Sequence, residues 1–197
     1  MNEPLPIVDG LTLSQEHRKL LRPGEAIRMP DETAHYLPRY FYILESWQQA
    51  RETRLSAHFT LSELMSVDCR ETDILLRRFP HYVPCAISVL ARYLEEFRSR
   101  VDAPVMVMVN GGYRSPAHQF SETPSLHLWA TAADIYRVGD TWLDEPKSIE
   151  RYGRIASAIG QEVFVKPHGN GPGETDDHLH FDIGYLHSIP RHLTEVA

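Results

Sequence analysis

Two short runs of the sequence, residues 125–134 and 177–182, contain side chains that could bind a metal ion. Between them they hold three histidines and three aspartates. One ligand set that can be drawn from them is His127, Asp134 and His180. Two histidines and one carboxylate, with a fourth position left for water, form the pattern of a catalytic zinc site.

The second run is predicted to be a strand with two different faces. Because side chains alternate along a strand, His178, His180 and Asp182 would point to one face, and the apolar residues between them to the other. Residues 132–136 alternate in the same way, and Asp134 follows two small alanines that leave room for a ligand. If the two strands are neighbours, Asp134 and His180 can meet at one metal ion, with a histidine arriving from the preceding loop.

Each of these features alone is weak evidence for a metal site. A single histidine in a strand is usually an ordinary hydrogen-bonded or exposed residue, and motif matches carry false positives. The joint pattern, Ser-x-His-x6-Asp followed downstream by Asp-His-x-His, favours a metal site over chance clustering. Asp182 would then orient a histidine ligand, or alternatively form a salt bridge or turn cap.

A glycine turn that carries Arg114 follows the apolar run of residues 104–109, which we interpret as a buried strand. Gly111 and Gly112 permit a tight turn and a close approach of the backbone. An arginine in such a turn is well placed to bind a carboxylate through two hydrogen bonds. The alternative is that Arg114 pairs with a structural Asp or Glu, and the neighbouring metal site favours the substrate-binding interpretation.

These motifs resemble those of the zinc D-alanyl-D-alanine peptidases of the M15 type, whose fold is shared with the Hedgehog signalling domain. The resemblance includes the two histidine motifs and the Gly-Gly-Tyr-Arg-Ser-Pro turn at residues 111–116, and it covers about residues 58–197. It implies that His127, Asp134 and His180 bind one zinc ion per chain.

The same resemblance implies roles for the residues around the metal. The general base would be His178 or Asp177, and Arg114 would hold the C-terminal carboxylate of the substrate. Tyr113 and Ser125, which belong to the same motifs, are assigned with Arg114 to substrate binding. An extended strand would turn Asp177 away from the site and so favours His178, whereas a bend at Asp177 would reverse this.

The implied activity is hydrolysis of a D-Ala-D-Ala-type peptide bond next to a free carboxylate, in peptidoglycan precursors or stem peptides. The enzyme would be a D,D-carboxypeptidase or dipeptidase, and its partner a peptide substrate ending in D-Ala. Two alternatives stay open: a peptidoglycan endopeptidase of phage-lysin type, and a non-catalytic, zinc-containing binding module like Hedgehog. Ala130 stands where the family usually has Gly, and residues 117–124 form a short segment without the usual glycines, which affects substrate choice more than metal binding.

Composition narrows the choice of partners and location. The net charge of −7 argues against a nucleic-acid partner. No stretch approaches the ~20 apolar residues of a membrane helix, so we expect no membrane insertion. The N-terminus lacks the basic and apolar regions of a signal peptide, which predicts a cytoplasmic protein, or one exported without a recognisable signal. Cys69 and Cys85 are too few for a disulfide framework and are expected to be reduced.

The predicted fold class is α+β, with a small, largely antiparallel sheet, helices packed on one side and the zinc site on the open face. Residues 1–57 would form a helical or irregular extension, and residues 58–197 the zinc peptidase domain. A helix over residues 39–53 carries an aromatic stripe that either packs on the catalytic domain or offers a partner surface. Other helices are predicted over residues 15–21, after a capping box at 60–63, from residue 84 to about 97, and over 149–159; another strand is predicted over 162–166.

Overall fold

The computed structural model describes residues 4–29, 32–65, 70–71, 73–121 and 124–188. Its helices are η1 (Gly10–Thr12), α1 (Gln15–Leu21), α2 (Trp47–Glu52), α3 (Leu61–Leu64), α4 (Ile87–Val101), η2 (Gln119–Ser121), η3 (Leu126–Trp129) and α5 (Pro146–Ser157). Its strands are β1 (Ile7–Asp9), β2 (Ala26–Arg28), β3 (Ala34–Tyr36), β4 (Tyr40–Leu44), β5 (His81–Pro84), β6 (Val105–Val107), β7 (Ala132–Val138), β8 (Thr141–Trp142), β9 (Phe164–Val165) and β10 (Leu179–Asp182). Cys69 lies outside the described residues, and Cys85 is a buried free thiol.

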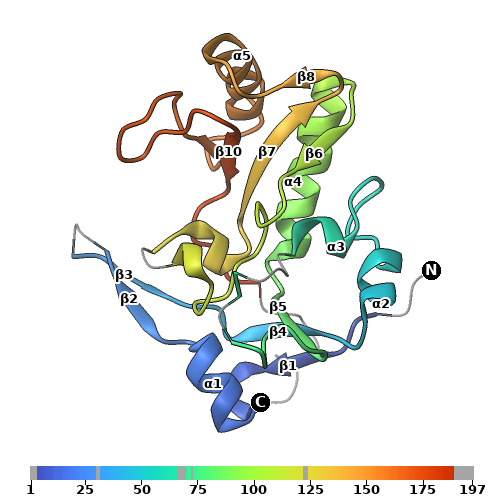
Figure 1. Ribbon diagram of the computed structural model, residues 1–197, viewed down its shortest axis with the longest axis vertical. Helices are drawn as coiled ribbons and strands as arrows, with labels where there is room; N and C mark the ends of the chain where they lie inside the picture. The colour runs from blue at the N-terminus through green and yellow to red at the C-terminus, as the bar shows by residue number, and fades with distance from the viewer. Residues whose placement is uncertain (1–3, 30–31, 66–69, 72, 122–123, 189–197) are drawn as a thin grey trace.

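The larger sheet has five strands in the order β6-β7-β10-β9, with β8 paired to β7, and all of its pairings are antiparallel. In Figure 1 it occupies the upper half of the molecule, with the long helix α4 running beside it and α5 at its end. Ile135, Leu179 and Phe181 point from the sheet into one core with the apolar faces of α4 and α5. The predicted α+β class with a small antiparallel sheet is confirmed.

Helix α4 forms over most of the predicted range, but it begins at Ile87 rather than at Pro84, which is the last residue of strand β5. Its residues Ile87, Leu90, Ala91, Leu94 and Phe97 recur at three-to-four spacing and are all buried, which is the pattern of a helix with one face in the core. The predicted capping box is also present, because Thr60 and Glu63 cap α3 reciprocally. Helix α1 likewise begins after its Ser14 cap.

The prediction of one helix over residues 39–53 was wrong in its first half. Tyr40–Leu44 form strand β4, which pairs with β1 on one side and with β5 on the other. The run is rich in aromatic and β-branched residues, which suit a strand, and pairing on both sides outweighs the weak helical spacing. A helix begins only after Ser46, whose hydroxyl accepts a hydrogen bond from the Gln49 amide at 3.1 Å.

Other element boundaries also differ from the prediction. Strand β6 ends at Val107, and Val109 is 79% exposed rather than buried, because the chain turns toward the glycines directly after the strand. Helix α5 begins at Pro146, two residues before the predicted cap, since proline is favoured in the first helical turn. Strand β5 was not predicted from the sequence. Within the described ranges, no helix has the length and apolar character needed to span a membrane.

The first 57 residues contact the later part of the chain at several points. Strand β4 pairs with β5, and Leu44 and Ala50 belong to the same core as the larger sheet. The hairpin β2–β3 lies at one side of the molecule in Figure 1, and the backbone oxygen of Tyr36 accepts a 2.7 Å hydrogen bond from Trp129 Nε1. The division at residue 57 as a domain boundary stays a prediction.

Candidate metal centre

Strand pairing places two of the predicted ligands side by side. Asp134 of β7 and His180 of β10 are direct partners in the antiparallel register. Directly opposed residues project from the same face of a sheet, so both side chains leave the sheet on the face opposite α4 and α5. The predicted alternation is therefore confirmed for residues 179–182, with Leu179 and Phe181 buried in the core on the other face, whereas His178 lies before the strand.

His127 reaches the same point from helix η3. The helix ends at Trp129, and the next residue, Ala130, has a left-handed backbone (φ 56°), the conformation in which glycine is favoured. The Nδ1–H of His127 donates to the Gly112 carbonyl at 2.8 Å, which fixes the tautomer and leaves Nε2 as a lone-pair donor. Nε2 lies 3.2 Å from Asp134 Oδ1.

His180 is held in a comparable way. Its Nδ1 lies 2.8 Å from Asp134 Oδ1, while its Nε2 lies 3.3 Å from Asp182 Oδ2. One ligand atom from each of His127, Asp134 and His180 lies within 4.8 Å of the other two, and all three residues are buried. This group could hold a metal ion, and the carboxylate partner on the far nitrogen of His180 is typical of metal-binding histidines.

The electrostatics keep the cluster in a form suited to metal binding. Burial raises the pKa of Asp134, but the surrounding histidines outweigh this effect and hold the pKa well below its usual range. Burial lowers the pKa of His127 despite the neighbouring carboxylate. At neutral pH Asp134 is thus an anion and His127 a neutral imidazole, which are the protonation states of metal ligands.

His178 and Asp177 form a hydrogen-bonded pair at the edge of the cluster. The chain bends at both residues before β10 begins, so they do not alternate as an extended strand would. His178 Nδ1 lies 2.5 Å from Asp177 Oδ1, and its Nε2 lies 3.3 Å from Asp134 Oδ1. His178 is 20% exposed at its side chain and Asp177 is 67% exposed. The imidazole, rather than the carboxylate, therefore faces the cluster.

The pKa of His178 is raised above its usual value. Burial alone would lower it, but hydrogen bonds and charge from Asp134 and Asp177 outweigh that effect. His178 is therefore a stronger proton acceptor than an isolated imidazole in the same place.

Arg114 forms the ion pair that the sequence left as an alternative. Its Nη2 donates to Asp134 Oδ2 at 2.5 Å, and its Nε donates to the Asn110 carbonyl at 2.5 Å. The side chain is 13% exposed and its guanidinium lies 5.5 Å from the Phe120 ring centroid. Binding of a substrate carboxylate by Arg114 stays a prediction, whereas its contact with a predicted metal ligand is present.

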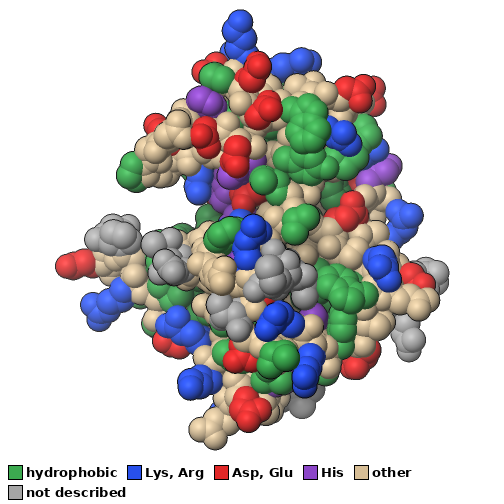
Figure 2. Space-filling model, in the orientation of Figure 1, with side chains coloured by type: hydrophobic (Ala, Val, Ile, Leu, Met, Phe, Trp, Pro, Cys, Tyr) green, Lys and Arg blue, Asp and Glu red, His purple; other side chains and the backbone are tan. Residues whose placement is uncertain are grey.

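The cluster lies in a cleft with a volume of about 390 Å³. This volume is within the usual range for ligand-binding clefts. The space-filling view shows the hollow between the upper and lower parts of the molecule, with histidine side chains inside it (Figure 2). Ser125 lines the cleft as predicted, together with Phe120 and Lys166.

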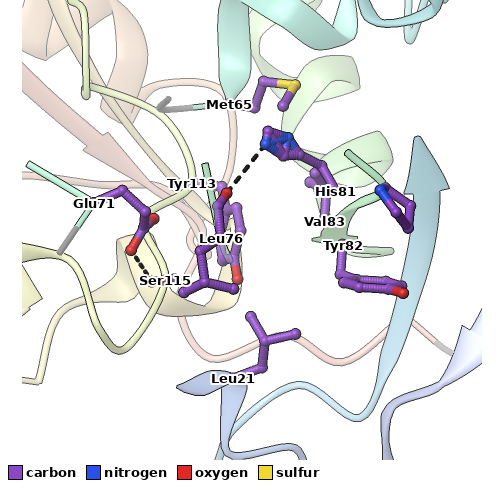
Figure 3. Close-up of a pocket in the computed structure, with 10 residues that line it drawn as sticks. Leu21, Met65, Glu71, Leu76, His81, Tyr82, Val83, Tyr113 and Ser115 are labelled. Atoms are coloured by element: carbon purple, nitrogen blue, oxygen red, sulfur yellow. Dashed lines mark hydrogen bonds between the residues drawn. The ribbon is translucent and has the colours of Figure 1, made fainter. Parts of the chain in front are cut away.

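Tyr113 is the predicted site residue that the structure does not bring to the cleft. Its side chain is buried and lines a separate hollow with Leu21, Met65 and His81, shown in Figure 3. Ser115, from the same turn, donates a 2.5 Å hydrogen bond to Glu71 there. The glycine turn therefore has two sides, with Arg114 facing the metal cluster and Tyr113 facing the core.

His81 in this hollow is expected to make folding sensitive to acid. Burial lowers its pKa to about 4, while the unfolded chain binds a proton near the ordinary value of 6.5. Because the unfolded chain binds this proton more readily than the folded protein, the free energy of unfolding is highest above pH 6.5. It falls by about 3 kcal/mol in total as the pH decreases toward 4. Urea unfolding at pH 7 and pH 4 should show a smaller loss for His81→Phe than for the wild type. Equal losses in the two proteins would contradict this assignment.

Two residues of the site region were not found from the sequence. Lys166 was interpreted only as part of a strand, and the strand register would have been needed to place it beside His180. Trp129 supports the helix that carries His127 through a hydrogen bond to a residue 93 positions earlier, which no local pattern indicates.

Comparison with protein-family models, curated proteins and solved structures found no match.

Proposed function

We propose that this protein is a zinc-dependent peptidase of the D,D-carboxypeptidase or dipeptidase type. The observation that carries the proposal is the buried His127, Asp134 and His180 cluster, with the partly buried imidazole of His178 beside it in an open cleft. A structural zinc site has four protein ligands, whereas three ligands and access from a cleft suit catalysis. The resemblance of the motifs to the M15-type peptidases supports the same assignment.

Zinc bound by these three residues would lower the pKa of a water molecule to about 7 and polarise the scissile carbonyl. His178 Nε2 takes the proton from the attacking water and returns it to the leaving amine. Asp177 accepts the Nδ1–H of His178 and stabilises the imidazolium that forms during the transfer, as carboxylates do in other His-based sites. Arg114 holds Asp134 in one orientation through its ion pair.

The proposed substrate is a short peptide that ends in D-Ala. The peptide class and the D configuration come from the family resemblance, and a metal-binding group with an adjacent base supports a hydrolytic reaction. The zinc-loaded protein should release D-Ala from an acyl-D-Ala-D-Ala peptide, and a chelator should abolish the release. Zinc binding without release from D- or L-terminated peptides would contradict the peptidase assignment and favour a binding module.

His178→Ala is expected to lower kcat by about 100- to 10,000-fold, the usual contribution of a positioned general base. Zinc content should stay at the wild-type level, because His178 is not one of the three ligands of the cluster. D-Ala release and metal content, measured on the same samples, check this result. His168→Ala is the matched control, since this histidine lies in the loop before β10 and outside the cleft lining. An equal loss of zinc and activity in His178→Ala would mean that His178 is a ligand instead.

A further inference from the structure

We infer that Lys166 binds the terminal carboxylate of the substrate and thereby selects peptides with one residue after the scissile bond. This inference deepens the proposed function and rests on it. It assigns to Lys166 the role that the sequence suggested for Arg114. Three observations carry it: the strand register, the direction in which the side chains at β9 point, and the different contacts of Lys166 and Arg114.

The strand register places Lys166 in line with the metal cluster. Val165 pairs with Phe181, so the next position of the chain, Lys166, lies opposite His180, and its amide donates to the His180 carbonyl at 3.3 Å. His180 in turn pairs with Asp134. Asp134, His180 and Lys166 therefore form one row across three neighbouring strands, and such rows project from one face of a sheet.

The direction of Lys166 follows from its neighbour. Val165 packs against the core and its Cγ1 lies 3.2 Å from the Cβ position of Gly153 in α5, so Val165 faces the helices. Since adjacent side chains in a strand point to opposite faces, Lys166 points to the face that carries Asp134 and His180. It lines the cleft there, and because it lies at the edge of the sheet it also borders the groove along α5.

The two cations differ in what they already bind. Arg114 donates to Asp134 and to the Asn110 carbonyl, and its side chain is largely buried. For Lys166, no ion pair or side-chain hydrogen bond is present within the described part of the chain. A substrate carboxylate can therefore pair with Lys166 without breaking an existing contact, whereas pairing with Arg114 would compete with Asp134.

The spacing suits a peptide with a single terminal residue. Neighbouring strands lie about 4.8 Å apart, so Lys166 is one strand beyond His180 and two beyond Asp134. One extended residue spans about 3.5 Å, which places a terminal carboxylate on the order of 5 Å from the scissile carbonyl. The flexible lysine stem lets the ammonium group reach a carboxylate at this distance from the scissile carbonyl. A substrate with more residues after the scissile bond would place its terminal carboxylate beyond the ammonium group.

The test compares an N-acyl-D-Ala-D-Ala peptide with the same peptide carrying a C-terminal amide, using the zinc-loaded full chain. Lys166→Met should raise KM for the carboxylate form by about tenfold, with kcat changed less than about threefold. It should leave KM for the amide form unchanged, and Lys166→Arg should restore most of the difference. Lys147→Met, at an exposed position of α5, is the matched control and should behave as wild type.

Binding of the same two peptides to zinc-loaded His178→Ala protein, measured by calorimetry with and without Lys166→Met, gives a readout independent of turnover. A preference for the carboxylate that is lost with Lys166→Met supports the inference, even if the peptides are not cleaved and the proposed function fails. Cleavage with an unchanged preference in Lys166→Met would overturn the inference and leave the proposed function standing. An equal loss for the carboxylate and amide forms would also overturn it, since that indicates a structural role.

Discussion

Asp134→Asn is expected to lower zinc affinity at least about 100-fold, beyond the 10- to 100-fold effect of losing an outer partner of a ligand. Asp134 Oδ1 lies within 3.3 Å of all three histidines of the site, so its charge organises the whole cluster. An amide keeps the shape of the side chain but removes that charge. Zinc titration in a competing chelator measures the change directly.

The same substitution should also destabilise the metal-free protein. Arg114 is largely buried and would lose its ionic partner, which costs about 3 kcal/mol when one member of a buried pair is removed. Asp182→Asn is the graded control, because Asp182 Oδ2 lies near the far nitrogen of His180 while its Oδ1 accepts a hydrogen bond from the Gly184 amide at 3.0 Å, so this substitution should cost 10- to 100-fold in affinity. Wild-type zinc affinity in Asp134→Asn would rule out Asp134 as a ligand.

Gly112→Ala is expected to reduce the free energy of unfolding by about 3 kcal/mol or more. A Cβ atom at this position would lie 2.0 Å from the carbonyl oxygen of Leu64, a backbone atom that cannot rotate away. The same segment is fixed by the Tyr113 amide, which donates to that carbonyl at 2.7 Å. Overpacking against rigid atoms falls at the severe end of single substitutions.

A second effect of Gly112→Ala concerns the metal. The Gly112 carbonyl holds Nδ1 of His127, so a shift of this backbone should weaken zinc binding as well as folding. Gly153→Ala is the control, since its Cβ would meet two side-chain methyls, of Val165 at 3.2 Å and of Leu179 at 3.6 Å, inside a helix where alanine is favoured. Its unfolding free energy should change by less than about 1 kcal/mol. Equal denaturant midpoints for Gly112→Ala and wild type would contradict the argument.

Residue pattern alone was enough to predict that His127, Asp134 and His180 come together as a group that could hold a metal ion. The alternation of polar and apolar residues predicted that His180 and Asp182 share a face, and the small residues before Asp134 indicated a second strand of the same kind. His178 was placed on the same face by that pattern, but it lies in a bend before the strand. Both inferences depend on local periodicity, which is expressed in the sequence itself. The pairing of Asp134 with His180 then followed, because neighbouring strands bring such faces together.

Features that depend on distant contacts could not be predicted in this way. Arg114 has equally good carboxylate partners in a substrate and in the protein, and only the fold shows Asp134 within its reach. Residues 40–44 carry weak helical spacing but find strand partners on both sides, which a local pattern cannot include. Lys166 acquires its place beside His180 only through the register of β9 with β10.

The most direct test of the central claim is a zinc titration of the metal-stripped protein, combined with X-ray absorption at the zinc edge. We predict one zinc ion per chain, with two imidazole nitrogens and at least one carboxylate oxygen among its ligands. His180→Ala should lose this binding, while His178→Ala should keep it. Absence of zinc binding in the wild type, or unchanged binding in a variant lacking His127, Asp134 and His180, would contradict the claim.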